Sequence, residues 1–231
     1  MRTRNRTSGR GYTLLELVVT VCIIGILAAL AAIGMNRYKP RAGLANTAAE
    51  VTALLNYARQ NAQSSGNDTI VMFFTGFANP SGGIGRVIVY EDPNFNFFNA
   101  ASAINFGGYN PAAPAIPAAP ASSSFETLDL PRVTTFGYNV VAVGPLPAPY
   151  GPTIAPALAS PCSFCAGGRG AVLFDARGRA RFYNANGAPL AIAGGTLAFT
   201  SNAIGWSSQI EGYRILVITP AAGAVKTFNR G

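Results

Sequence analysis

An apolar run near the start of the chain limits most strongly what this protein can fold into. Residues 12–35, YTLLELVVTVCIIGILAALAAIGM, contain Glu16 as their only charged residue. A helix of this length is sufficient to cross the roughly 30 Å hydrocarbon core of a bilayer. The run is therefore predicted to be a transmembrane helix, so the core of a folded domain has to come from the residues that follow it.

The charges on either side of the run indicate its orientation. Basic residues lie before it (Arg2, Arg4, Arg6 and Arg10) and after it (Arg37, Lys39 and Arg41). The short leader is uniformly basic, and the positive-inside rule favours keeping it in the cytoplasm and exporting the rest. A conventional secretory signal is the alternative, because the small residues AALAA at 28–32 weakly offer a cleavage site after the run.

The order of features at the N-terminus argues for a different kind of processing. A Gly11-Tyr12 junction precedes the apolar run, and Glu16 follows four residues after Tyr12. A lone carboxylate at membrane depth is costly and needs a partner. Cleavage after Gly11 would expose an α-amino group on Tyr12, and Glu16 of one subunit could neutralise the amine of its neighbour. Such pairing would favour lateral association in the bilayer.

Residues 10–17, Arg-Gly followed by Tyr-Thr-Leu-Leu-Glu-Leu, and the apolar helix after them closely resemble the class III signal of type IV prepilins and pseudopilins. The resemblance implies that a prepilin peptidase cuts after Gly11 and N-methylates Tyr12, and that Glu16 is the assembly glutamate. Tyr12 stands where phenylalanine is more usual. The alternative is a plain signal anchor with an incidental glutamate.

The same resemblance implies a location and partners. The chain would be a single-pass protein of the bacterial inner membrane, with its C-terminal domain in the periplasm or on an extracellular filament. Its partners would be other pilins or pseudopilins, contacted through the N-terminal helix, and the prepilin peptidase that removes the leader, residues 1–11.

A second, amphipathic stretch is predicted to continue the helix over residues 36–66. Apolar residues recur at spacings of three and four, which is typical of one buried helix face: Leu44, Ala48, Val51, Leu55, Ala58 and Ala62. The opposite, polar side is expected to carry Thr47, Glu50, Asn61 and Gln63. The helix should end near Ser64-Ser65-Gly66, and Pro40 should kink it or break it locally.

Residues 67–231 are predicted to form an exported β-rich domain. Short β-branched and aromatic runs predict strands at 69–75, 86–91, 134–143, 171–175, 180–183, 196–200, 213–219 and 224–228. Hairpin turns are expected at 176–179 and 221–224. The predicted fold class is α+β and pilin-like, with a long N-terminal helix, half transmembrane and half amphipathic, packed on a mostly antiparallel sheet.

Three features give this domain a resemblance to the GspH/FimT family of minor pseudopilins and minor pilins. Residues 57–62, YARQNA, lead through Gly66 into an apolar strand, and hairpins close the domain at 172–178 and 215–223. Residues 94–161 are outside this resemblance and form an insertion rich in proline and alanine, in which the Ala-Pro stretches should be extended and poorly ordered. The insertion is either a tolerated surface segment or a partner-contact surface at a filament tip.

Enzymatic chemistry is not expected, because the chain has no histidine and thus lacks the usual general base and the commonest metal ligand. No cofactor and no metal site are predicted. Cys162 and Cys165 lie in an exported Pro- and Gly-rich stretch, where a small disulfide is the simplest interpretation. Cys22, in the apolar run, is expected to be a helix-packing residue.

A basic cluster lies in the predicted 176–179 hairpin. Arg177, Arg179 and Arg181 alternate, and alternate residues of a strand share one face. The functional interpretation is DNA binding by phosphate neutralisation, as in some FimT-like minor pilins; the alternative is a solvated hairpin. The leading hypothesis is a minor pilin or pseudopilin of a type IV pilus or type II secretion filament that acts in filament initiation or tip assembly. The second is a DNA-binding minor pilin for DNA uptake.

Overall fold

The computed structural model describes residues 12–93, 98, 106–113, 125–137, 161–203 and 212–230. The chain divides between Lys39 and Pro40 into two compact units. Helix α1, Leu14–Ser65, contains this boundary and contributes residues to both units. The predicted leader, residues 1–11, and most of the predicted insertion lie outside the described residues.

In the first unit, α1 is apolar on all sides. The segment Leu14–Ala32 has a mean hydropathy of 2.7, and none of it is buried. Leu15 is 73% exposed and Ile24 is 64% exposed. A helix that is apolar all round has to be covered by lipid or by other helices. The segment is long and apolar enough to cross a membrane, and its position near the N-terminus also fits a signal sequence.

In the second unit, residues 40–65 of α1 have the amphipathic pattern that the sequence predicts. Leu44, Val51 and Leu55 are almost fully buried in the core. The helix ends at Ser65, where Gly66 takes a positive φ of 75° and its N–H bonds to the Ala62 carbonyl. A glycine just beyond the last helical residue is a common way to end a helix, because it adopts this conformation without a Cβ clash.

Two predictions for α1 need correction. The helix continues through Pro40, so of the kink or local break predicted there, the break does not occur. Thr47, placed on the polar side, is only 1% exposed. Its hydroxyl donates to the Gly43 carbonyl at 3.0 Å and lies 3.4 Å from the Thr134 hydroxyl. A threonine in a helix can be buried in this way because the preceding turn satisfies its polar atom.

The second unit contains one sheet, in which ten strands are formed by the described residues. Their bounds are β1 Asp68–Ala78, β2 Ile84–Asp92, β3 Phe125–Asp129, β4 Thr134–Phe136, β5 Arg169–Phe174, β6 Ala180–Tyr183, β7 Pro189–Leu190, β8 Gly195–Ser201, β9 Tyr213–Ile218 and β10 Val225–Arg230. The order is β10-β9-β8-β4-β2-β1-β5-β6-β7, with β3 paired to β2. The predicted, mostly antiparallel character is confirmed, since the β2–β4 pair is the only parallel one among the described strands.

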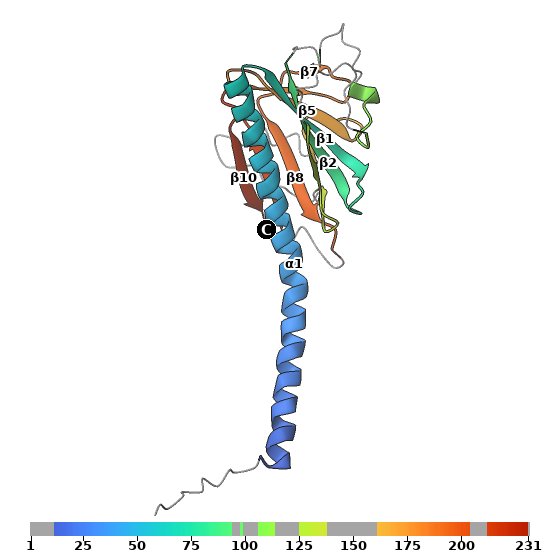
Figure 1. Ribbon diagram of the computed structural model, residues 1–231, viewed down its shortest axis with the longest axis vertical. Helices are drawn as coiled ribbons and strands as arrows, with labels where there is room; N and C mark the ends of the chain where they lie inside the picture. Colours follow the sequence, from blue (N-terminus) through green and yellow to red (C-terminus); the bar gives the residue numbers. More distant parts are fainter. Residues whose placement is uncertain are drawn as a thin grey trace, which may run out of the picture. The chain divides into compact units, whose positions relative to one another are not determined.

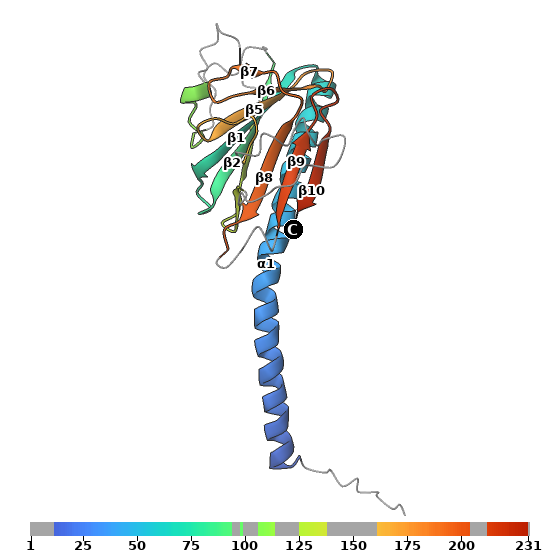
Figure 2. The ribbon, with the colours of Figure 1, turned by 180° about the vertical axis from the view of Figure 1, so that it is seen from behind.

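Side chains alternate across the sheet and form an apolar cluster on each face. Val71 and Phe73 of β1 belong to the larger cluster, together with Val51 and Leu55 of α1. Ile70 and Met72 belong to the smaller cluster, which includes Phe106 and Tyr109. The C-terminal part of α1 lies along one face of the sheet (Figure 1), and strands β8, β9 and β10 are seen from the other side in Figure 2.

The predicted insertion is partly integral to the sheet. Its described residues supply β3, which was not predicted, and β4, which pairs antiparallel with β8. Of the predicted strand 134–143, the structure forms β4, which ends at Phe136. Gly137 is described but does not belong to a strand, and residues 138–143 lie outside the described residues. The Ala-Pro stretches are also outside it, apart from residues at the edges.

Both predicted hairpin turns are confirmed, and they lie against each other. The first joins β5 to β6, with Gly178 at φ 74°, and the second joins β9 to β10, with Gly223 at φ 57°. The Ala180 N–H donates to the Pro220 carbonyl at 2.9 Å, which links the two hairpins. A Cβ at Gly223 would collide with the Gly178 carbonyl.

Candidate functional site

The N-terminal end of α1 is capped by Thr13. Its hydroxyl accepts a hydrogen bond from the Glu16 N–H at 3.3 Å, and its carbonyl accepts from Glu16 and Leu17. Thr13 and Glu16 thus occupy the first and last positions of the Thr-x-x-Glu capping pattern. This pattern is visible in residues 13–16 but was not among the features predicted from the sequence. Glu16 therefore has a local position, one turn inside a helix N-terminus, where a negative charge is favourable.

The structure describes most of the predicted processing and assembly residues. Gly11 lies outside the described residues. Tyr12 precedes the helix and is 82% exposed, and Glu16 is exposed in the first turn. Within the described residues Glu16 has no ion-pair partner. The hydroxyl of Thr20 donates to the backbone carbonyl of Glu16 at 2.8 Å, so this hydroxyl and this carbonyl satisfy each other. The Glu16 carboxylate is the polar group of this turn that needs a partner in an apolar environment.

The three cysteines differ in their state. Cys162 and Cys165 form a disulfide, with Cα atoms 5.2 Å apart. The loop that it closes is attached to β8, because the Ser163 N–H donates to the Thr196 carbonyl and the Ser163 hydroxyl accepts from the Thr196 N–H at 2.8 Å. Cys22 is a free, exposed thiol on the apolar helix, so packing of this residue would require lipid or a second helix.

The basic hairpin differs from the predicted row of three aligned arginines. Only Arg181 lies on β6, whereas Arg177 and Arg179 are in the turn. Asp175 forms ion pairs with two of these arginines. Its carboxylate lies 2.7 Å from Nη2 of Arg179 and 3.7 Å from Nη2 of Arg181. This role of Asp175 was not predicted, although an aspartate just before a glycine turn is a signal for local backbone capping.

The Asp175 carboxylate also organises the turn backbone. It accepts hydrogen bonds at 3.0 Å from the N–H groups of Arg177 and Arg179. Burial alone would raise the pKa of Asp175, but the hydrogen bonds from the Arg179 side chain and from both N–H groups outweigh it and lower the pKa. One anion therefore offsets part of the positive charge of the cluster, which favours a structural hairpin over a phosphate-binding one.

We expect Asp175→Asn to destabilise the protein by about 1–3 kcal/mol at neutral pH, because a charge-assisted network loses its anion. A lowered folded-state pKa means that the stabilisation is present above the unfolded pKa of about 3.9 and is lost as the pH falls through the folded value. The difference between wild type and variant should therefore shrink below about pH 4. Denaturant unfolding of the full chain in detergent, followed by circular dichroism from pH 3 to 7, measures this.

Asp68→Asn provides a control of opposite sign. Burial raises the pKa of Asp68, so its ionisation costs stability as the pH rises. The Asn variant should gain stability relative to wild type over that range. If both variants respond to pH in the same direction, the proposed role of Asp175 is wrong.

Two further arginines of the sheet, Arg169 and Arg86, donate hydrogen bonds to backbone carbonyls of residues 106–111. Arg169 donates from Nη1 to the carbonyls of Phe106 and Gly107, at 2.9 and 2.7 Å. Arg86 pairs with Asp129 and donates to the Pro111 carbonyl. The basic character of the sequence is thus partly used to hold residues 106–113 against the outer face of the sheet. In the described part of the chain, no cluster of Cys, Asp and Glu is suited to hold a metal ion.

In comparisons with known proteins, no family model matches this chain, and neither the curated proteins nor the solved structures contain a significant match.

Proposed function

We propose that the chain is a membrane-anchored minor pilin or pseudopilin, a subunit that enters a type IV pilus or type II secretion filament through its N-terminal helix. The observation that supports this most is the combination of an exposed, apolar helical segment, Leu14–Ala32, with one carboxylate, Glu16, in its first turn. Helix capping by Thr13 gives Glu16 a local role, but its carboxylate has no ion-pair partner within the described residues, and a neighbouring copy of the helix could supply one.

The proposed mechanism depends on the charges created by processing. Removal of residues 1–11 after Gly11 gives Tyr12 an α-amino group, which carries a positive charge at neutral pH. Glu16 of one subunit then pairs with the amine of the next, and the low dielectric of the bilayer strengthens the attraction. Apolar side chains such as Leu15 and Ile24 pack the neighbouring helices together, while the second unit is exported.

In this proposal the chain works as a structural component in filament initiation or at the tip. It resides in the bacterial inner membrane, and its exported part lies in the periplasm or on an extracellular filament. The prepilin peptidase acts on it at Gly11 and Tyr12. The amphipathic and sheet-forming residues that follow Pro40 give the exported part a core of its own, because Val51 and Leu55 pack against β1 and its neighbours.

Glu16→Ala tests the proposal. Cross-links between the chain and other membrane subunits, identified by mass spectrometry, should fall about tenfold or more, equivalent to about 1.4 kcal/mol or more of association free energy. The amount of protein in the membrane should stay unchanged, because the apolar run becomes more apolar. Glu16→Asp, which retains the charge, should recover part of the yield.

Thr13→Ala is the matched control for helix capping. It removes the hydroxyl that bonds to the Glu16 N–H, at a cost of about 1 kcal/mol to the helix terminus, and leaves the charge in place. Cross-linking should remain close to wild type. Equal losses in Thr13→Ala and Glu16→Ala would show that Glu16 acts only through the cap, and normal assembly of Glu16→Ala would reject the amine pairing.

A further inference from the structure

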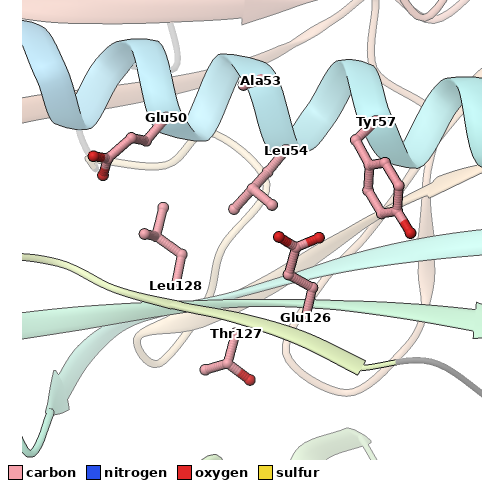
Figure 3. A pocket seen from close by; sticks show the side chains of 7 residues that line it. All are labelled: Glu50, Ala53, Leu54, Tyr57, Glu126, Thr127 and Leu128. Carbon is pink, nitrogen blue, oxygen red and sulfur yellow. The ribbon is translucent and has the colours of Figure 1, made fainter.

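A cleft of about 480 Å³ lies between α1 and strand β3 in the second unit. Figure 3 shows it from close by, with the helix along one wall and the strand along the other. It is lined by Glu50, Ala53, Leu54, Tyr57, Glu126, Thr127 and Leu128. Neither the predicted assembly residues nor the basic hairpin contribute to it.

The walls of the cleft combine apolar surface with negative charge. The helix residues have spacings of three and four, so they share one side of α1. Tyr57 is 43% exposed there, and Leu128 of β3 is partly buried against the core. In Figure 3, Leu54 and Leu128 lie between the carboxylates of Glu50 and Glu126.

No positive charge from the described residues balances these two carboxylates. Glu50 and Glu126 are both exposed, and the ion pairs of the described residues involve other acids. Among the described residues that line the cleft, none is a lysine or an arginine. Two acids on facing walls without a cation favour a ligand that brings positive charge, and they disfavour phosphate groups.

The strand side of the cleft is a sheet edge with no further strand among the described residues. β3 pairs with β2 along its length, from Arg86↔Asp129 to Tyr90↔Phe125, and no described strand pairs with its other side. Glu126, Thr127 and Leu128 are consecutive, yet all three line the cleft. Because successive side chains point to opposite faces, this places the backbone edge of β3 at the cleft. Unpaired N–H and C=O groups of an edge are a template for another strand.

We propose that this cleft binds an extended, cationic segment of another polypeptide, which adds to the sheet as a strand beside β3. Backbone hydrogen bonds to β3 supply part of the affinity, and alternate side chains of the segment face the helix. Lysine or arginine at two of those positions pairs with Glu50 and Glu126, and a β-branched residue between them covers Leu54. This binding site does not depend on the proposed assembly through Glu16.

The test uses the full chain in neutral detergent and a labelled peptide, Thr-Lys-Thr-Val-Thr-Lys-Thr, whose lysines and valine share one face when extended. Fluorescence anisotropy at low salt should show saturable binding, weakened about tenfold or more by the double variant Glu50→Gln/Glu126→Gln. Glu91→Gln makes the same change of charge per site outside the cleft and should leave binding unchanged.

Peptide variants test the strand addition. Replacing both lysines with glutamate should abolish binding, and N-methylation of alternate amides, which removes donors but retains the charge, should weaken it about tenfold. Absence of binding to the wild type, or equal binding to the double variant, would overturn the site. Equal binding of the N-methylated peptide would overturn strand addition. Self-association of the chain that the double variant abolishes would assign the cleft to a second copy and overturn the proposed partner.

Discussion

Replacing Gly11 with leucine is expected to leave residues 1–11 attached to nearly every molecule. In the proposed processing, the peptidase cuts the bond between Gly11 and Tyr12. A glycine lets the backbone approach an active site closely because it has no Cβ, and a branched side chain at that position obstructs the approach. Intact-mass measurement of the membrane-extracted protein would show the retained leader directly.

The leader offers a matched control for this variant. Gly9 lies two residues before Gly11, and Gly9→Leu adds the same side chain to the same segment. Processing of Gly9→Leu should be close to wild type. Because the retained leader leaves Tyr12 without a free amine, Gly11→Leu should also reduce subunit cross-linking as strongly as Glu16→Ala does. Normal removal of the leader from Gly11→Leu would contradict the proposed cleavage site.

Replacing Arg86 with alanine is expected to lower the free energy of unfolding by about 3 kcal/mol, the low end of the cost of breaking a buried ion pair from one side, because Asp129 keeps some contact with solvent. The Arg86 side chain is 8% exposed and that of Asp129 is 22% exposed. The guanidinium donates to both Asp129 oxygens, to the Pro111 carbonyl at 2.6 Å, and lies over the Phe77 ring at 4.6 Å. Its loss leaves the Asp129 charge without this partner.

Chemical denaturation of the full chain in detergent, followed by circular dichroism, measures this cost. Arg132→Ala is the matched control, since Arg132 is exposed and its loss should change stability by no more than about 0.5 kcal/mol. Arg86→Lys retains the charge but cannot form the two-pronged bond, and it should lie between the two alanine variants. A loss below about 1 kcal/mol in Arg86→Ala would show that the pair contributes little.

Features encoded by neighbouring residues could be predicted from the sequence. The buried face of α1 follows from its three- and four-residue spacing, and the β5–β6 and β9–β10 hairpins follow from glycines flanked by apolar runs. Strand β3 was missed because Glu126 and Asp129 make it look polar. It is a strand because β2 lies beside it, and Arg86 there neutralises Asp129. That pairing joins residues 43 positions apart.

The candidate sites divide in the same way. The Gly11-Tyr12 junction and Glu16 lie within six consecutive residues, 11–16, so a sequence pattern suffices to propose them. The charge balance of the basic hairpin depends on where the Asp175 carboxylate points, and its contact with Arg179 and Arg181 appears only in the folded turn. The acidic cleft requires α1 and β3 to lie face to face, which no local pattern of residues 50–57 or 126–128 indicates.

The intact mass and N-terminal residue of the wild-type chain, purified from bacterial membranes, test the central proposal most directly. We expect a chain that begins at Tyr12 and carries one additional methyl group on its N-terminus, with Glu16 and the apolar run retained. A chain that still begins at Met1, or one cut after the AALAA residues at 28–32 so that the apolar run is lost, would contradict it.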